Sequence, residues 1–380
     1  MLRYSIMVSV IFLAVGCNSS ESTVQTTNSK PQSYKSISIT NNITPITVFA
    51  ELSVGDEYLV HAANIAAKYL DSDGDGIWDN QAVANHMANL SSYGATLFIF
   101  KQEYADKDQF KAAVNKFPSN VQALFVNDKV SQSLYETEMV LCPSSTTFAA
   151  CFPAGSDKRD ASYEEILHII THTGYAQVYS ELSESETVHA SAVDLADIDR
   201  YINVAMDNAR GDLTATPAGT TARINNLANS RDFTTVNACD EDQDPDTGSI
   251  EYDCVWSEEN RVNGEFVYPA GSATFSYYDS SADYSTMVTE YTYWTINAAL
   301  GMLEHLSGNV TYSNEYRCLS LASFAPGAAC ASDTGVQALY GAGAVAGNLV
   351  MSINPYQLPT SIPFGAYTPN GTPRTWSINK

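Results

Sequence analysis

The residues best suited to chemistry lie in one short segment, from Glu164 to Tyr175. At about 100° per residue on a helix, its acids and histidines fall on one side, and its isoleucines and leucine fall on the other. The ordinary interpretation is a solvated helix face, but such faces usually include lysine or arginine, and this one has neither. We therefore treat the stripe as a candidate metal site. Its members are Glu164, Glu165, His168, Thr171, His172 and Tyr175.

Two arrangements of these side chains would bind a metal ion. In the first, Glu164 and His168, one helical turn apart, are ligands, and Glu165 beside the first ligand is the catalytic general base. In the second, His168 and His172 are the ligand pair, and Glu165 is a ligand or the base. A site rich in carboxylate is less selective for zinc, so zinc or another divalent transition metal is expected.

Glu290 is the predicted third ligand. It lies in an almost wholly apolar segment, residues 285–306, which predicts a buried helix. A carboxylate in such a helix is costly unless it is paired with a cation or bound to a metal. The alternative is a buried salt bridge with a base such as Arg200 or Arg210.

Residues 71–80 indicate a second cation site. Aspartates stand at alternate positions in this segment, and an asparagine occupies its tenth position. A chain wraps oxygen ligands around Ca²⁺ in this way, and Gly76 supplies the sharp turn. An EF-hand loop has a bidentate Glu at position 12, where this chain has Ala82, so Asp79 would have to close the site. Structural calcium is the predicted role, and the alternative is a solvated acidic turn. The predicted ligands are Asp71, Asp73, Asp75 and Asp79.

These motifs resemble those of known families. The DxDGDGxxDN loop is similar to the calcium loops of EF-hand and thrombospondin type 3 proteins. The EExxH segment resembles the HExxH helix of gluzincin-type zinc metallopeptidases, with Glu164 in place of the first His. In that family a glutamate on a later helix completes the site, which implies this role for Glu290. Together with the TEYxYW segment around Glu290, the motif order also resembles a family of uncharacterised secreted lipoproteins, which implies a shared fold and no particular activity.

The N-terminal residues predict export. Residues 1–16 have the features of a signal peptide: Arg3 supplies the positive charge, and the apolar run that follows is too short to span a bilayer. Residues 13–17 resemble the lipobox of bacterial lipoproteins, which implies that Cys17 becomes the lipidated N-terminus. Asn18 after it implies the outer membrane, on its periplasmic or cell-surface face. The alternative is an ordinary secretory signal.

The remaining six cysteines fall in three local pairs, which predicts three disulfides in an oxidising compartment. Each would stabilise the fold by roughly 3 kcal/mol in the chain-entropy model. None of the six has the spacing of a zinc site. The predicted pairs are Cys142 with Cys151, Cys239 with Cys254, and Cys318 with Cys330.

The elements that position these residues predict an α+β fold. Hydrophobic residues make up 44% of the chain, enough to form a core. Residues 17–44 show no apolar period and are predicted to be a lipidated, flexible tether, and residues 45–380 a single globular domain. The domain should combine a small mixed sheet with several packed helices, including an EF-hand-like helix-loop-helix. Strands are expected at 46–51, 95–100, 121–126 and 273–277, and helices at 57–70, 81–90, 107–116, 163–173, 186–209 and 285–306.

Charge narrows the choice of partners. With 19 basic and 43 acidic residues, the 380-residue chain has a formal net charge of −24. Such a charge repels phosphate backbones and anionic lipid surfaces, which excludes nucleic acid and leaves the lipid as the only link to a membrane. The sequence favours a lipid-anchored, peptidase-like, metal-dependent hydrolase stabilised by calcium. The alternative is a non-catalytic calcium-binding surface lipoprotein that binds a protein or polysaccharide.

Overall fold

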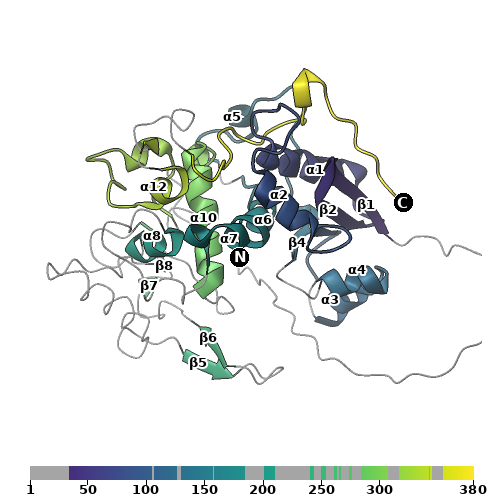
Figure 1. Cartoon of the computed structure of the whole chain (residues 1–380). Helices are drawn as coiled ribbons and strands as arrows, with labels where there is room; N and C mark the ends of the chain where they lie inside the picture. The colour runs from purple at the N-terminus through teal and green to yellow at the C-terminus, as the bar shows by residue number, and fades with distance from the viewer. Residues whose placement is uncertain are drawn as a thin grey trace, which may run out of the picture.

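The structure, a computed structural model, describes most of the chain between Tyr34 and Lys380 (Figure 1). The signal segment, Cys17, Arg200, Arg210 and the predicted Cys239–Cys254 pair lie outside the described residues. The described ranges are 34–104, 107–125, 130–156, 158–184, 201–209, 240–243, 250–253, 261–262, 265–266, 274–275, 284–306, 316–341, 343–344 and 354–380.

A four-stranded mixed sheet forms the centre of the fold. Its strands are β1 (Tyr34–Asn41), β2 (Ile43–Glu51), β3 (Ala95–Phe100) and β4 (Ser131–Tyr135), in the order β1-β2-β3-β4. β1 is antiparallel to β2, while β2, β3 and β4 run parallel. The combination of this sheet with packed helices confirms the predicted α+β class, and β3 has the predicted bounds.

β1 corrects the prediction of a flexible tether. Residues 34–44, assigned to the tether, belong to β1 and the start of β2, so the prediction is wrong for them. Ile37 pairs with Val48 and Ile39 with Ile46, and both isoleucines are fully buried. The physical reason is the alternation of isoleucine with serine and threonine, a period of two that buries one face of a strand.

Helices cover both faces of the sheet. α1 (Asp56–Leu70) and α2 (Gln81–Ala88) connect β2 to β3 and share a core with the aliphatic residues of the strands. α3 (Lys107–Val114) and α4 (Ser119–Phe125) connect β3 to β4 and pack on the other face, against Phe98 and Phe100 (Figure 1).

The strand predicted at residues 121–126 is wrong, because α4 includes residues 121–125. The carbonyl of Pro118 accepts hydrogen bonds from the N–H groups of Val121 and Gln122, at 2.9 Å each, and so starts a helical turn. A short apolar run fits a strand or a helix equally well by periodicity. Proline just before the run was the signal for a helix start.

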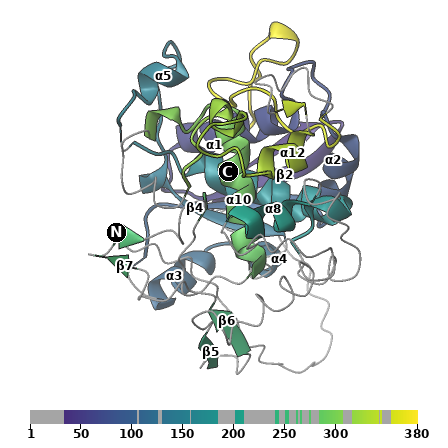
Figure 2. The ribbon, with the colours of Figure 1, turned by 90° about the vertical axis from the view of Figure 1, so that its left-hand side faces the viewer.

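Two helices carry the candidate metal ligands. α6 (Ser162–Ile170) packs on the sheet and α1, and continues into a π-helical turn, Thr171–Tyr175. α10 (Tyr284–Ala299) packs against α6, with α8 (Ile202–Ala209) and α12 (Gly335–Tyr340) beside it (Figure 2). These are the helices predicted near residues 163–173 and 285–306. Shorter elements are α5 (Phe148–Cys151), α7 (Ala176–Val178), β5 (Asp240–Gln243), β6 (Ile250–Asp253), β7 (Arg261–Val262) and β8 (Glu265–Phe266), with 3-10 turns at Glu136–Glu138, Ser180–Leu182, Glu304–Leu306, Leu321–Phe324 and Pro369–Gly371.

Covalent and terminal contacts complete the fold. Two of the predicted disulfides are present, Cys142–Cys151 and Cys318–Cys330. The C-terminal segment, residues 354–380, runs over α1 and ends against β1, where Ser36 and Asn379 exchange two backbone hydrogen bonds of 2.9 Å.

Within the described residues, no helix combines the length and apolar character that crossing a membrane requires.

Candidate metal centre

The polar stripe on α6 is covered rather than solvated. Glu164 and His168 are only 4% and 6% exposed, although they lie on the side of the helix opposite the isoleucines. α10 packs over this side and supplies Glu290, which is 8% exposed. The alternative of a solvated helix face is therefore wrong for Glu164 and His168.

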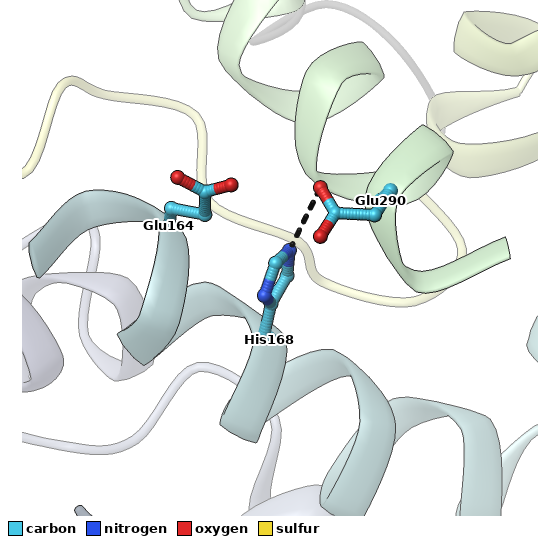
Figure 3. Close-up of side chains that lie close together, drawn as sticks. All are labelled: Glu164, His168 and Glu290. Atoms are coloured by element: carbon cyan, nitrogen blue, oxygen red, sulfur yellow. Dashed lines mark ion pairs between the residues drawn. The ribbon is translucent and has the colours of Figure 1, made fainter. Parts of the chain in front are cut away.

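Glu164, His168 and Glu290 form one group. A nitrogen of His168 and one oxygen from each carboxylate all lie within 4.8 Å of one another. Glu290 reaches from α10 toward the imidazole, and its Oε2 is 3.6 Å from His168 Nε2 (Figure 3). Two ligands at about 2.0–2.1 Å from a tetrahedral ion are separated by about 3.3 Å, so the spacing of His168 and Glu290 is close to that of two ligands of one metal.

His168 Nε2 is the imidazole atom that faces Glu290, at a distance too long for a hydrogen bond. It is buried and has no hydrogen bond. A buried polar nitrogen without a partner is unfavourable, and a metal ion facing it would supply one. Burial lowers the pKa of His168, but the carboxylates of Glu290, Glu165 and Glu164 raise it by a larger amount, and the resulting pKa is about 9. These three carboxylates favour positive charge on the imidazole, which a proton supplies, and they would equally favour a bound cation beside it.

Glu165 lies on the other side of the same imidazole. Its Oε2 is 3.6 Å from His168 Nδ1 and accepts a hydrogen bond from the Gln132 side chain on β4. A carboxylate in this position orients a metal-binding histidine and makes it a better ligand. The predicted general base therefore faces Nδ1 in this structure rather than the group formed by Glu164 and Glu290.

Arg159, which the sequence analysis did not single out, is an immediate neighbour of the group. Its guanidinium forms an ion pair with Glu164 and lies 5.1 Å from the centre of the Trp294 ring and 5.6 Å from that of Tyr293. A carboxylate has two oxygens with about four lone-pair sites, so Glu164 is able to bind Arg159 and a metal at once. Nothing in the local sequence pattern marks an arginine just before a helix as a partner for that helix.

His172 occupies a different contact from the predicted one. Its Nδ1 is 2.5 Å from Glu184 Oε2, and the other Glu184 oxygen accepts a hydrogen bond of 2.7 Å from Thr289. His172 is not a member of the group of Glu164, His168 and Glu290. Of the two predicted arrangements, the structure brings together the first.

The aspartate loop forms a second acidic group between α1 and α2. Asp71, Asp73 and Asp79 offer oxygens within 4.8 Å of one another, which is compatible with a cation. Asp75, the fourth predicted ligand, is not in this group, and its Oδ1 accepts a hydrogen bond of 2.7 Å from Ile77 N. Burial raises the pKa of Asp79, the Ser72 N–H lowers it, and the neighbouring aspartates raise it again, to about 7.

The local sequence explains the shape of this loop. Gly74 and Gly76 have φ angles of 73° and 85°, which only glycine adopts easily. Asp71 accepts hydrogen bonds from the N–H groups of Gly74 and Gly76 at 2.9 Å, and its carboxylate also accepts one from the Tyr367 hydroxyl. Asn80 then caps α2 by accepting from Val83 N.

The C-terminal segment holds the loop from outside. Asn370 N donates to Gly74 O at 2.7 Å, and Ser72 Oγ accepts from Thr360 N at 2.9 Å. Between loop and segment lies a cavity of about 370 Å³, lined in part by Asp73, Asp79 and Gln357. The cavity beside the α6–α10 group, lined in part by Arg159 and Tyr293, measures only about 20 Å³, which is room for water. The hydrogen bonds between the loop and the C-terminal segment join residues almost 300 positions apart, so no local sequence pattern could have predicted them.

Comparisons of this chain with protein-family models, with curated proteins and with solved structures found no match. No activity is therefore transferred from a relative. What the chain does has to be inferred from the chemistry of its two acidic groups, each of which could hold a metal ion.

Proposed function

We propose that this chain is a metal-dependent hydrolase whose metal ion is held by Glu164, His168 and Glu290. The observation that carries the proposal is the convergence of these three buried side chains from α6 and α10, with His168 Nε2 left without a hydrogen bond. The carboxylates of Glu164, Glu165 and Glu290 surround His168, and Arg159 pairs with Glu164, so a divalent ion would balance the remaining buried negative charge.

The donor set favours zinc or another divalent transition metal. One imidazole and two carboxylates match the ligand types of catalytic zinc sites, which leave a position open for water or substrate. When bound, such an ion acts as a Lewis acid and lowers the pKa of a bound water. The carboxylate-rich set also suits other divalent ions.

The neighbouring side chains have separate roles in this proposal. Glu165, to which the Gln132 side chain donates a hydrogen bond, faces the imidazole of His168 from its Nδ1 side. Glu165 has a partly exposed side chain, at 21%, and is the carboxylate we assign as the proton acceptor, a role that requires it to turn away from both Gln132 and His168 Nδ1. Arg159 binds one side of Glu164 and leaves the other for the ion.

A peptide is the substrate class best supported. β4 ends the strand order of the sheet in the described part of the chain, and its residue Gln132 contacts Glu165. An edge strand offers unpaired backbone groups to an extended peptide, which binds by adding a strand. A peptide on β4 would thus run close to the proposed proton acceptor.

The remaining features describe where the enzyme works and how it is stabilised. We propose that Asp71, Asp73 and Asp79 bind a structural calcium ion, with the loop carbonyls and Asp75 as further oxygen donors. The signal peptide and Cys17 would place the protein on the outer membrane through a lipid, outside the cytoplasm. Disulfides at Cys142–Cys151 and Cys318–Cys330 fit an oxidising compartment.

A non-catalytic binding protein is the second candidate. Two observations favour it: the ion pair between Arg159 and Glu164 already neutralises one proposed ligand, and the cavity beside the group has room only for water. The larger cavity lies at the calcium loop instead. In this reading the buried charges balance one another without a metal, and the protein binds a protein or polysaccharide partner through its calcium-stabilised surface.

Metal analysis of the purified protein separates the two candidates. We expect about one transition-metal ion per chain in the wild-type protein, lost in His168→Ala and retained in the control His86→Ala, which alters a histidine of α2. Calcium should be unchanged in all three proteins. Calcium alone, at the same level in wild type and His168→Ala, would favour the binding protein and contradict the hydrolase.

A further inference from the structure

We propose that Glu184 is a positioning residue of the metal centre, whose carboxylate fixes the helix that carries His168 to the helix that carries Glu290. This inference rests on the proposed metal-dependent function and adds a residue that neither binds the ion nor contacts the group directly. Glu184 follows a short 3-10 turn, Ser180–Leu182, and is 8% exposed.

Each oxygen of Glu184 serves a different helix. Oε2 is 2.5 Å from Nδ1 of His172, which lies on the π-helical turn that continues α6. Oε1 accepts a hydrogen bond of 2.7 Å from the hydroxyl of Thr289 on α10. Both partners are close in sequence to a proposed ligand, because His172 follows His168 by one turn and Thr289 directly precedes Glu290. The carboxylate therefore bridges the two helices beside the metal centre.

The bridge matters because the ligands come from separate elements. His168 Nε2 and Glu290 Oε2 are 3.6 Å apart, and a functional centre has to hold such groups to within about 0.5 Å. A hydrogen bond between an imidazole and an ionised carboxylate is stronger than one between neutral groups, and it suits a rigid connection. The π-helical turn at His172 adds a separate indication, since such turns are frequent at functional sites.

Neutral contacts join the same helices farther along. The Tyr69 hydroxyl, from α1, donates to Tyr163 O on α6 at 3.2 Å and to Asn297 Oδ1 on α10 at 3.3 Å. These distances are longer than those made by Glu184. Arg159 also connects the two helices, through Glu164 on α6 and the rings of Tyr293 and Trp294 on α10. Glu184 adds a second charged connection, made through His172 and Thr289.

A matched control is available on another side of α10. Asp333 is also buried and also accepts hydrogen bonds from two elements, at 2.5 Å from Tyr291 on α10 and at 2.7 Å from Thr274. It connects α10 to the region of α12 and not to α6. Loss of its charge perturbs a buried network of the same kind without altering the connection between the two ligand-bearing helices.

The test is a titration of metal-free, calcium-loaded protein with Co²⁺, followed by visible absorption, in wild type, Glu184→Ala, Glu184→Gln and the control Asp333→Asn. Loss of a partner bonded directly to a metal ligand typically weakens metal affinity by about 10–100-fold. Because Glu184 acts through His172 and Thr289, we expect a weakening no larger than this for Glu184→Ala, with an altered Co²⁺ spectrum. Glu184→Gln, which keeps one acceptor oxygen, should show a smaller loss. Asp333→Asn should bind Co²⁺ with the affinity and spectrum of wild type.

The outcomes separate the two proposals. If wild type binds Co²⁺ and Glu184→Ala has the same affinity and spectrum, the role of Glu184 is refuted while the metal centre stands. An equal loss in Asp333→Asn also refutes it, because a general loosening of α10 then explains both. If wild type binds no Co²⁺, both proposals fail. Should Glu184→Ala not fold, Thr289→Val removes the bond from Glu184 to α10, together with a bond of 3.1 Å to Ser285 O within that helix, and is judged by the same criteria.

Discussion

The charge state of His168 leads to a quantitative prediction for the metal-free protein. Burial lowers the pKa of His168, and the carboxylates of Glu290, Glu165 and Glu164 outweigh it, so that the pKa rises from 6.5 to about 9. A histidine whose pKa is higher in the folded protein stabilises it when protonated. This stabilisation is complete below pH 6.5 and is lost as the pH rises through about 9. At about 1.4 kcal/mol per pKa unit, the interval corresponds to an upper limit of about 3 kcal/mol.

Urea unfolding at pH 6 and pH 9.5 measures this effect. Other groups also titrate between these values, so the informative quantity is the difference between wild type and His168→Gln in calcium-loaded protein stripped of transition metals. We expect the free energy of unfolding of wild type to fall by up to about 3 kcal/mol more than that of His168→Gln over this range. The control His86→Gln should follow wild type. If the free energy of unfolding falls equally in wild type and His168→Gln between pH 6 and pH 9.5, the prediction is refuted. His168 would then not be held protonated by its carboxylate neighbours.

Three further predictions concern the neighbours of the two sites. Arg159→Gln should destabilise the metal-free protein by about 3–5 kcal/mol, as expected when one member of a buried ion pair is removed, and added Zn²⁺ should restore part of this in thermal unfolding. If Arg159→Gln destabilises the protein equally with and without Zn²⁺, the ion pair is purely structural. Chelation of calcium should make residues 354–380 sensitive to limited proteolysis, since Asn370 and Thr360 bond the loop, and Asp73→Ala should show that sensitivity even with calcium present. Equal proteolysis with and without calcium would contradict this coupling. Cys17→Ser should abolish incorporation of labelled fatty acid, and labelling that persists would rule out Cys17 as the lipidated residue.

The helices of the site were predictable because their side chains follow a clear period. The stripe from Glu164 to His172, and one acid in the apolar segment around Glu290, indicated two facing helices before any contact was known. The glycines and alternating aspartates of the 71–79 loop likewise fix its turn locally. These features depend on residues within a few positions of one another, which is what a sequence pattern records.

The contacts that the sequence did not reveal are those between distant segments. Arg159, Gln132 and Glu184 reach the site from three separate segments of the chain, and no spacing connects them to His168. His172 was assigned to the metal because it follows His168 by one helical turn, whereas Glu184 binds it instead. β1 was overlooked because serine and threonine fill its outward positions, which made a buried strand resemble a polar linker.

The most direct test of the metal centre is a crystal structure of the protein soaked with Zn²⁺, with data collected on both sides of the zinc absorption edge. The account predicts one anomalous peak bounded by Glu164, His168 and Glu290, at about 2.0–2.1 Å from His168 Nε2. Absence of anomalous density there at saturating Zn²⁺, with Arg159 and His168 alone neutralising the carboxylates, would contradict it.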